Sequence, residues 1–293
     1  MKEFKKRFSE HYDKNHKKLL VIAIILMILS LAYMTIFYIN NNDFIHKDIS
    51  LTGGTSITID KDINTQELKQ DLDNKLEDLE VREIYDLFTK EKKAIVIKTK
   101  TSAEESKNIL ENYLGYELTS DNSSIEYTGS VLSENFYKQL LIALLIAFVF
   151  MAIVVFLMFR TFVPSLAVIL SAFADILMTL TIINIIGTKV SSAGIIAFLL
   201  LIGYSVDTDI LLTNRVLRRS GETNSKMYGA LKTGLTMSLT SLLAILVAFL
   251  FVKNFSQTLS QILFILSIGL FIDIFNTWIT NASIIKLYVE KKK

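Results

Sequence analysis

The sequence contains no cysteine and only one proline, Pro164, among its 293 residues. Without cysteine the chain can form neither a disulfide framework nor a thiolate metal site. We predict no metal site, no cofactor and no enzymatic activity. Because proline is tolerated only in the first turn of a helix, its scarcity allows long uninterrupted helices, and Pro164 lies where a helix start is expected.

Apolar residues make up 51% of the chain and occur in long blocks. A bilayer core about 30 Å thick is crossed by about 20 apolar helical residues. Six segments are long enough: 19–39, 137–159, 162–186, 190–213, 229–252 and 259–285. The first is too long for the core of a cleavable signal and has no small-residue cleavage site, so we expect a retained anchor. The sequence predicts an α-helical polytopic membrane protein with six transmembrane helices.

The distribution of basic residues predicts the orientation, because lysine and arginine in short flanks favour the cytoplasm. With six spans, the lysine-rich N-terminal tail, the loop that follows the fourth span and the C-terminal lysines all fall on one side. The other side receives only Lys189 and Lys253 in its short loops. We therefore expect a cell-membrane protein with cytoplasmic tails at 1–18 and 286–293, a first helix at 19–39, an extracytoplasmic domain at 40–136, and helices two to six within 137–285.

The predicted outer domain is net acidic, with 20 Asp and Glu against 12 Lys and Arg over residues 40–138. The basic balance of the whole chain is therefore a topology signal, and nucleic-acid binding is not expected. Strand patterns at 49–59, 81–88, 94–99 and 124–128 alternate with helical patterns at 64–79 and 102–114. Asn64 with Glu67 and Ser102 with Glu105 have capping-box spacing. This βαββαβ order predicts a small α+β, ferredoxin-like domain between the first and second helices.

Two adjacent glycines, Gly53 and Gly54, interrupt the first predicted strand. They could suggest a phosphate-binding loop, but no helix and no Lys-Ser or Lys-Thr pair follows directly. We expect a bulge or a close approach of two backbones instead.

Four aspartates lie inside predicted spans: Asp175, Asp207, Asp209 and Asp273. A carboxylate at a helix centre in the bilayer costs about 2.5–3.5 kcal/mol on insertion scales, so such groups usually face protein or water. Burial favours the neutral form of a carboxylic acid, which is the property that a proton carrier needs. Depths estimated from the helical rise differ among the four, which argues against one cluster of all of them.

Asp207 and Asp209 are two residues apart, so they point about 200° apart on a straight helix. Asp207 shares its face with Gly203, Tyr204 and Asn214, whereas Asp209 shares one with Ser205 and Thr213. They are therefore not expected to bind one small metal ion together. Hydroxyls of the fifth span, Thr236, Thr240 and Ser241, are candidate supporting groups, although such hydroxyls more often serve helix packing.

These features together resemble a known family. The chain has one span, a domain that opens with Thr-Gly-Gly-Thr at 52–55, and five further spans. It also contains Gly-Tyr-Ser-Val-Asp-Thr-Asp at 203–209 and Asn-Thr-Trp-Ile-Thr-Asn-Ala at 276–282. This combination resembles the SecF branch of the SecD/SecF protein-export family, in the resistance-nodulation-division superfamily. The archaeal branch fits best, because bacterial relatives usually carry Asn-Asp-Thr where this sequence has Asp-Thr-Asp.

The resemblance implies an accessory subunit of the Sec translocase. Its implied partners are a SecD-type membrane protein, the translocon channel and unfolded secretory polypeptides, all at the lipid bilayer, with export coupled to proton flow. Asp207 is our first candidate for the proton site, because SecD relatives carry the aspartate of a Val-Asp-Ala-Asn motif at this register. Asp209, Asp175 and Asp273 are the other candidates.

Other functions remain open on the sequence alone. Arg215, Arg218 and Arg219 are explained as positive-inside anchors, and docking on the translocon is the alternative. A transferase using the Asp-x-Asp pair at a metal would need water-facing carboxylates with more polar neighbours. Half of a proton-driven small-molecule efflux pump, or a purely structural subunit of the translocon, are the remaining alternatives.

Overall fold

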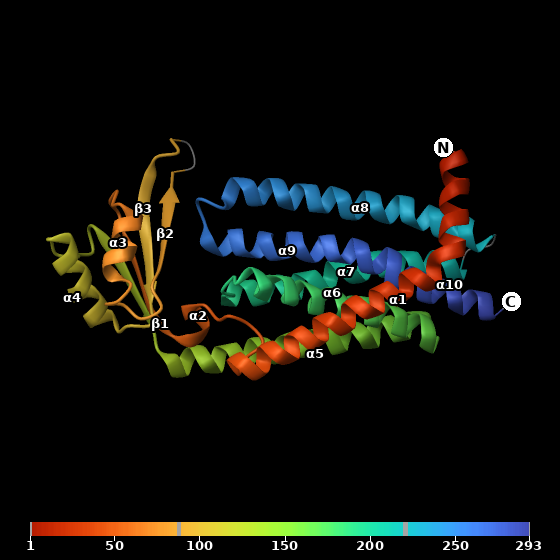
Figure 1. Ribbon diagram of the computed structural model, residues 1–293, viewed down its shortest axis with the longest axis horizontal. Helices are drawn as coiled ribbons and strands as arrows, with labels where there is room; N and C mark the ends of the chain where they lie inside the picture. Colours follow the sequence, from red (N-terminus) through yellow and green to blue (C-terminus); the bar gives the residue numbers. More distant parts are fainter. Residues whose placement is uncertain (1, 87–88, 219–221, 293) are drawn as a thin grey trace.

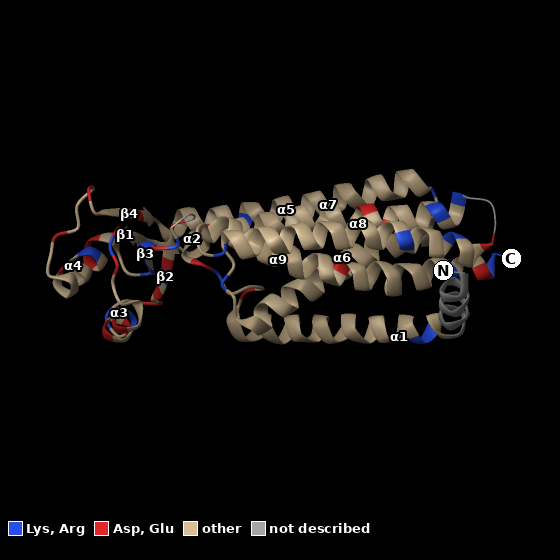
Figure 2. Cartoon of the chain, turned by 90° about the horizontal axis from the view of Figure 1, so that it is seen from above, with Lys and Arg blue, Asp and Glu red and all other residues tan. Residues whose placement is uncertain are grey.

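The computed structural model describes residues 2–86, 89–218 and 222–292, with side chains from residue 15 onward. A long helical bundle carries a small α+β domain at one end, which we call the domain end (Figure 1). Both chain termini lie at the opposite end of the bundle, which we call the terminal end (Figure 1). Only a few Asp, Glu, Lys and Arg residues are coloured along the middle of the bundle (Figure 2).

The described residues contain six helices long and apolar enough to cross a membrane, as predicted. They are α1 (Lys2–Asn41), α5 (Ser130–Phe159), α6 (Phe162–Ile186), α7 (Ser192–Arg218), α8 (Thr223–Val252) and a sixth span made of three consecutive segments. That last span runs through α9 (Gln257–Phe275), the π-helical η1 (Asn276–Asn281) and α10 (Ala282–Lys291). Pro164 lies in the first turn of α6, where its missing N–H is not needed.

Three spans form the inside of the bundle. In their most apolar stretches α6, α7 and the sixth span are 61, 56 and 50% buried, against 6% for α5 and for α8. The apolar side chains of α5 and α8 therefore form the outer surface that contacts lipid or another membrane protein. Polar groups on α6, α7 and α9 can meet inside the bundle without exposure to the hydrocarbon.

The α+β domain has the predicted βαββαβ order: β1 (Gly54–Ile59), α3 (Thr65–Leu72), β2 (Glu80–Tyr85), β3 (Lys92–Thr99), α4 (Ala103–Leu114) and β4 (Ser123–Thr128). Within the described residues the strands form one antiparallel sheet in the order β2-β3-β1-β4. Alternate residues of β1 and β3, such as Ile57, Ile59, Ile95 and Ile97, form its core with Leu68 and other side chains from α3 and α4. This is the ferredoxin-like arrangement.

Several predicted elements have different limits. The strand expected over 81–88 ends at Tyr85, and residues 87–88 lie outside the described part of the chain. Residues 49–52, expected in the first strand, form the short helix α2 (Ile49–Thr52), because Asp48 caps it by accepting a hydrogen bond from Ser50 N. The helix expected over 64–79 ends at Leu72. The predicted caps Asn64 and Ser102 do accept hydrogen bonds from backbone N–H groups, Asn64 from Gln66 N and Ser102 from Glu105 N.

The glycine pair makes close backbone contacts, as expected. Gly53 has φ +85°, and a Cβ there would lie 2.6 Å from both N and Cα of Ser130, at the start of α5. A Cβ on Gly54 would lie 2.5 Å from the carbonyl oxygen of Thr99 on β3. The absence of a side chain therefore lets the first strand pass closely between β3 and the first residue of the second span.

Several bonds attach the domain to the bundle. Asp48 N donates to Val190 O at 3.0 Å, and Ser192 N at the start of α7 donates to Ser50 Oγ at 3.2 Å. Lys189 Nζ lies 2.5 Å from Asp78 Oδ1. Burial alone would raise the pKa of Asp78, but its contacts with Lys189 and Lys100 outweigh this and hold it below the usual value. These contacts fix the position of the domain on the α6–α7 loop.

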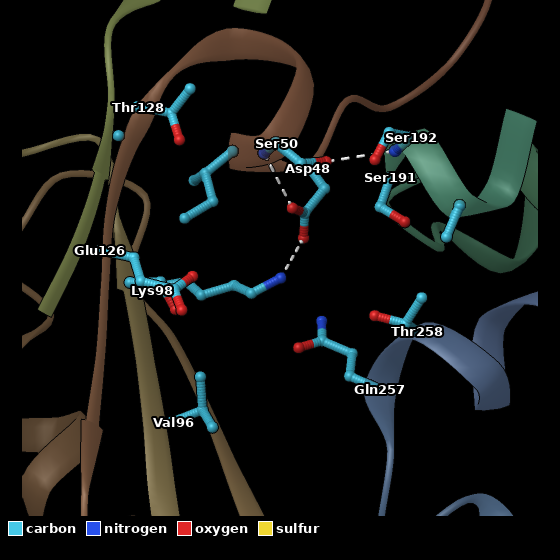
Figure 3. Close-up of a pocket in the computed structure, with 14 residues that line it drawn as sticks. Asp48, Ser50, Val96, Lys98, Glu126, Thr128, Ser191, Ser192, Gln257 and Thr258 are labelled. Atoms are coloured by element: carbon cyan, nitrogen blue, oxygen red, sulfur yellow. Dashed lines mark hydrogen bonds and ion pairs between the residues drawn. The ribbon is translucent and has the colours of Figure 1, made fainter. Parts of the chain in front are cut away.

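A polar cavity of about 290 Å³ lies between the sheet and the domain end of the bundle. In Figure 3 Lys98 from β3 points across it to Asp48, and the two side chains form an ion pair of 2.8 Å. Gln257 and Thr258 at the start of α9 line its opposite wall (Figure 3). The ends of α7 and α9 thus both reach the underside of the sheet.

Candidate functional site

The two aspartates of α7 lie in different environments. Asp209 is fully buried, on the face that also carries the buried side chains of Ser205 and Thr213. Asp207 is exposed, on the face of Gly203, Tyr204 and Asn214. The expected opposite facing of the pair is therefore observed, but Asp207, the first sequence candidate, lies away from the bundle interior. Its functional role stays a prediction.

Asp175 lies near the middle of α6 and is fully buried. Ser205 Oγ on α7 donates to its Oδ2, and Asn276 Nδ2 in η1 donates to its Oδ1 at 2.7 Å. The amide of Asn276 is held in this orientation because its Oδ1 accepts from Thr280 Oγ1 at 3.0 Å. Asp175 thus connects the third, fourth and sixth spans.

Asp273 and Asp209 make a second and a third connection. Thr277 Oγ1 donates to Asp273 Oδ1 at 3.1 Å, and Thr208 Oγ1 from α7 lies 3.2 Å from Asp273 Oδ2. Asn281 Nδ2 donates to Asp209 Oδ1 at 2.8 Å. Three of the four predicted carboxyl groups therefore lie in one buried cluster, close enough to repel one another if charged. The depth estimates placed Asp209 and Asp273 apart because the spans were expected to start at 190 and 259. In the structure α7 starts at Ser192 and α9 at Gln257, so the two aspartates lie 17 and 16 residues from their helix starts.

The π-helical segment explains how one span serves all three carboxyl groups. Asn276 and Asn281 are five residues apart, which in an α-helix would separate their directions by about 140°. A π-helical turn contains more residues, so the two asparagines reach Asp175 on α6 and Asp209 on α7. π-helical turns are frequent at functional sites.

Sequence reasoning did not assign a role to Asn276, Asn281, Thr208 or Thr277 in this cluster. A signal was present, because asparagine is costly in hydrocarbon and both asparagines interrupt an apolar span near Asp273. Their positions relative to the carboxylates depend on the π-helical turn, which the periodicity of an α-helix does not predict.

The chemistry of the cluster follows from its hydrogen bonds. The donors to the three carboxyl groups are hydroxyls and amides, which carry no positive charge to offset three ionised carboxylates. Like charges cannot all be held ionised at close range in a medium of low dielectric. Moreover, the buried Oδ2 of Asp209 has no hydrogen-bond partner among the described residues. The arrangement is suited to holding a proton inside the bundle.

The other predicted polar residues lie outside this cluster. On α8, Thr236 Oγ1 donates to Lys232 O and Thr240 Oγ1 to Thr236 O, so both hydroxyls are bonded within their own helix on an exposed face. Ser241 follows on the same helix, and the structure gives it no bond to the carboxylates. Asn214 and Gly203 are exposed on α7. The supporting groups of the cluster therefore come from α7 and η1.

The predicted basic anchors lie at the terminal end. Arg215 Nη1 donates to Gly229 O at 2.5 Å and Arg218 Nη2 to Met158 O at 3.0 Å. Arg219 lies outside the described residues. Both arginines thus bond carbonyls of neighbouring helices, which fits an anchoring role at the end of a span.

The fold and cluster define a polytopic membrane protein whose interior carries ionisable groups. Residues 108–291 match the family described as Protein export membrane protein SecD/SecF, C-terminal. Protein-export membrane protein SecF of Methanocaldococcus jannaschii is 39% identical over 95% of this chain and 97% of that protein. SecF of Pyrococcus furiosus is 34% identical over 96% of this chain and 94% of that protein. The chain belongs to the SecD/SecF protein-export family, as its sequence motifs predicted.

A solved structure agrees in fold. The crystal structure of SecDF, a translocon-associated membrane protein from Thermus thermophilus, superposes with a TM-score of 0.71 at 18% identity. The match covers 96% of this chain and 38% of that chain. This chain thus corresponds in fold to a part of a longer protein.

Proposed function

We propose that this chain is a SecF-type subunit that assists export of unfolded proteins across the cell membrane, and that its buried carboxyl cluster couples export to proton flow. The observation that carries the coupling is the meeting of Asp175, Asp209 and Asp273 inside the bundle with uncharged donors. Intramembrane carboxyl groups are costly and are typical of proton pathways. Family membership supports the role in export.

We further propose that the terminal end faces the cytoplasm and that the α+β domain lies outside. Support comes from the basic residues around both termini and in the α7–α8 loop. The tails would then be 1–18 and 286–293, the outer domain 40–136, and the spans 19–39 and 137–285. Because the chain has no cysteine, single cysteines introduced at the exposed Ser120 or Glu222 can be labelled from either side without background.

The exposed face of α7 supports a membrane partner of SecD type. It carries Asp207 and Asn214 beside Gly203 and Tyr204, and it lies in a span. Lipid tails cannot solvate a carboxylate, whereas a neighbouring protein helix can supply a hydrogen-bond donor. A small residue such as Gly203 also allows close helix approach.

We expect Asp207→Asn to weaken recovery of the SecD-type partner in mild detergent by about thirtyfold or more, because removing the charge of one partner of a buried, hydrogen-bonded pair at an interface costs about 2 kcal/mol or more. The exposed Glu134, at the domain end of α5, provides the matched control Glu134→Gln. Unchanged partner recovery with Asp207→Asn, or recovery of a homodimer alone, would contradict this assignment.

The export function is tested in vesicles that contain the translocon and the partner, with and without this chain. We expect the chain to increase the export of a secretory protein, and the increase to require a proton gradient. An increase that is independent of the gradient would indicate a structural subunit. No effect on export, together with proton-driven loss of a small molecule from the vesicles, would favour the efflux-pump alternative.

A further inference from the structure

The carboxyl cluster contains two groups made of the same three residue types. In the group nearer the domain end, Ser205 Oγ from α7 and Asn276 Nδ2 from η1 each donate to one oxygen of Asp175 on α6. Asn276 Oδ1 in turn accepts from Thr280 Oγ1. Both oxygens of Asp175 and both polar atoms of the asparagine amide therefore have partners within the protein.

The second group lies about one helical turn nearer the terminal end. It consists of Asp209 on α7, Asn281 in η1 and Ser171 on α6, so each of the three spans again contributes one member. Asn281 follows Asn276 by five residues, and Ser171 precedes Asp175 by four on a helix that runs the other way. Asn281 Nδ2 donates to Asp209 Oδ1 at 2.8 Å, and the hydroxyl of Ser171 lies beside the same carboxyl group.

Three buried atoms of this second group lack a hydrogen-bond partner among the residues that the structure describes. They are Asp209 Oδ2, Ser171 Oγ and Asn281 Oδ1. All three residues have an exposed fraction of 0%. Unbonded polar atoms are rare in protein interiors, and buried water typically bonds such atoms, with about three hydrogen bonds for each water. We propose that one water molecule binds to these three atoms.

The types of atom favour water over a metal ion. The serine hydroxyl can donate to the water oxygen, and the two hydrogens of the water can point to Asn281 Oδ1 and Asp209 Oδ2. One water thus satisfies all three atoms. A metal ion could bind the three oxygens, but it would leave the hydroxyl hydrogen of Ser171 without an acceptor in the described part of the chain.

The role of this water rests on the proposed function, in which Asp209 gains and loses a proton. On release, the bond between Oδ2 and its hydrogen breaks, and the proton forms a bond to the water oxygen; uptake is the reverse. Ser171 and Asn281 act through the water, so they are positioning residues. The other carboxyl groups that face Asp209 are those of Asp175 and Asp273, whose oxygens accept hydrogen bonds from protein groups. Asp209 is therefore the member of the cluster that exchanges a proton with the water.

The water site is tested by a structure of the whole chain at a resolution that shows ordered water. We expect a density peak within hydrogen-bonding distance of Asp209 Oδ2, Ser171 Oγ and Asn281 Oδ1, and its loss from Ser171→Ala. The peak should persist in the matched control Ser165→Ala, because Ser165 is also buried on α6 but donates to Thr161 O. No peak in the wild type, or an equal peak in Ser171→Ala, would overturn the proposal. So would a peak that disappears when choline replaces sodium and potassium, because that peak would be a cation.

The role of the water is tested by export into vesicles with and without a proton gradient. We expect Ser171→Ala to lower the gradient-dependent increase in export about fivefold, which is equivalent to the loss of one hydrogen bond of about 1 kcal/mol. Recovery of the membrane partner should not change. Ser171→Thr keeps the hydroxyl and should restore the increase, and Ser165→Ala should export as wild type. A wild-type increase in Ser171→Ala would overturn the role of the water.

Failure of this inference can be distinguished from failure of the proposed function. If Asp209→Asn leaves the gradient dependence of export intact while the wild type shows the density peak, the proposed proton coupling is wrong and the water site stands. If Asp209→Asn abolishes the gradient dependence while the wild type shows no peak, the water site is wrong and the coupling stands.

Discussion

Replacing Asp209 with asparagine is expected to abolish the part of protein export that depends on the proton gradient, while the chain still assembles with its partner. Asparagine has the same shape and keeps the acceptor for Asn281 Nδ2, so we expect a stability change of about 1 kcal/mol or less. It cannot exchange a proton as a carboxyl group does. The measurement is the ratio of export rates with and without a gradient, which should fall to unity.

Asp175→Asn should produce the same loss, because its carboxyl group belongs to the same cluster. Asp121→Asn, at an exposed position of the α+β domain, is the control and should export as wild type. Gradient dependence that survives in both cluster variants would show that the cluster is only a packing element. Partner recovery is measured for both cluster variants as well, because loss of the partner would also lower export. Of the aspartate variants, only Asp207→Asn is expected to lower recovery.

Gly53→Ala is expected to destabilise the protein by roughly 3 kcal/mol, from the strained backbone and a steric clash together. Alanine disfavours φ +85°, and its Cβ would lie 2.6 Å from backbone atoms of Ser130, which cannot rotate away as a side chain can. The contact joins the strand region of the domain to the start of α5. We expect an apparent melting temperature roughly 5–10 °C lower in detergent.

Substitutions at two other glycines distinguish backbone strain from the steric clash as the cause of the lost stability. Gly129 has φ −66° and no atom within 4 Å of an added Cβ, so Gly129→Ala should change stability by about 0.5 kcal/mol or less. Gly115 has φ +72° and equally open surroundings, so Gly115→Ala should show only the conformational cost of about 1–2 kcal/mol. If Gly53→Ala melts no lower than Gly115→Ala, the close approach to Ser130 contributes nothing.

The fold was predictable from the sequence because its main signals are local. Apolar length identified the spans, and side-chain alternation with caps at Asn64 and Ser102 identified the βαββαβ order. The error at 49–52 arose because β-branched and apolar residues there suit a strand, whereas the Asp48 cap and Gly53 close a helical turn. A cap that is followed by only four helical residues leaves no periodic pattern to detect.

The sequence predicts carboxyl groups inside the membrane, but it does not predict which residues form the buried cluster. Helical geometry separated Asp207 from Asp209, but both faces of α7 carry polar residues, so the sequence could not decide which face is internal. Packing of α7 against α6 and α9 decides it, and that packing is a contact between segments distant in sequence. Asn276 and Asn281 join the cluster through a turn with a period that differs from that of the helix on either side.

The sixth span is in effect two helices held at a fixed rotation by one wide turn. Because a π-helical turn holds about one residue more than an α-helical turn, winding the same residues as an α-helix would turn everything beyond η1 by about 100° around the axis. Asp273 would keep its partners on α7, whereas Lys286, now buried, and Glu290, now 3.4 Å from His16 of α1, would point elsewhere. The wide turn of η1 therefore sets the angular phase between the carboxyl cluster and the terminal end, and loss of that turn without loss of a residue should change their relative orientation.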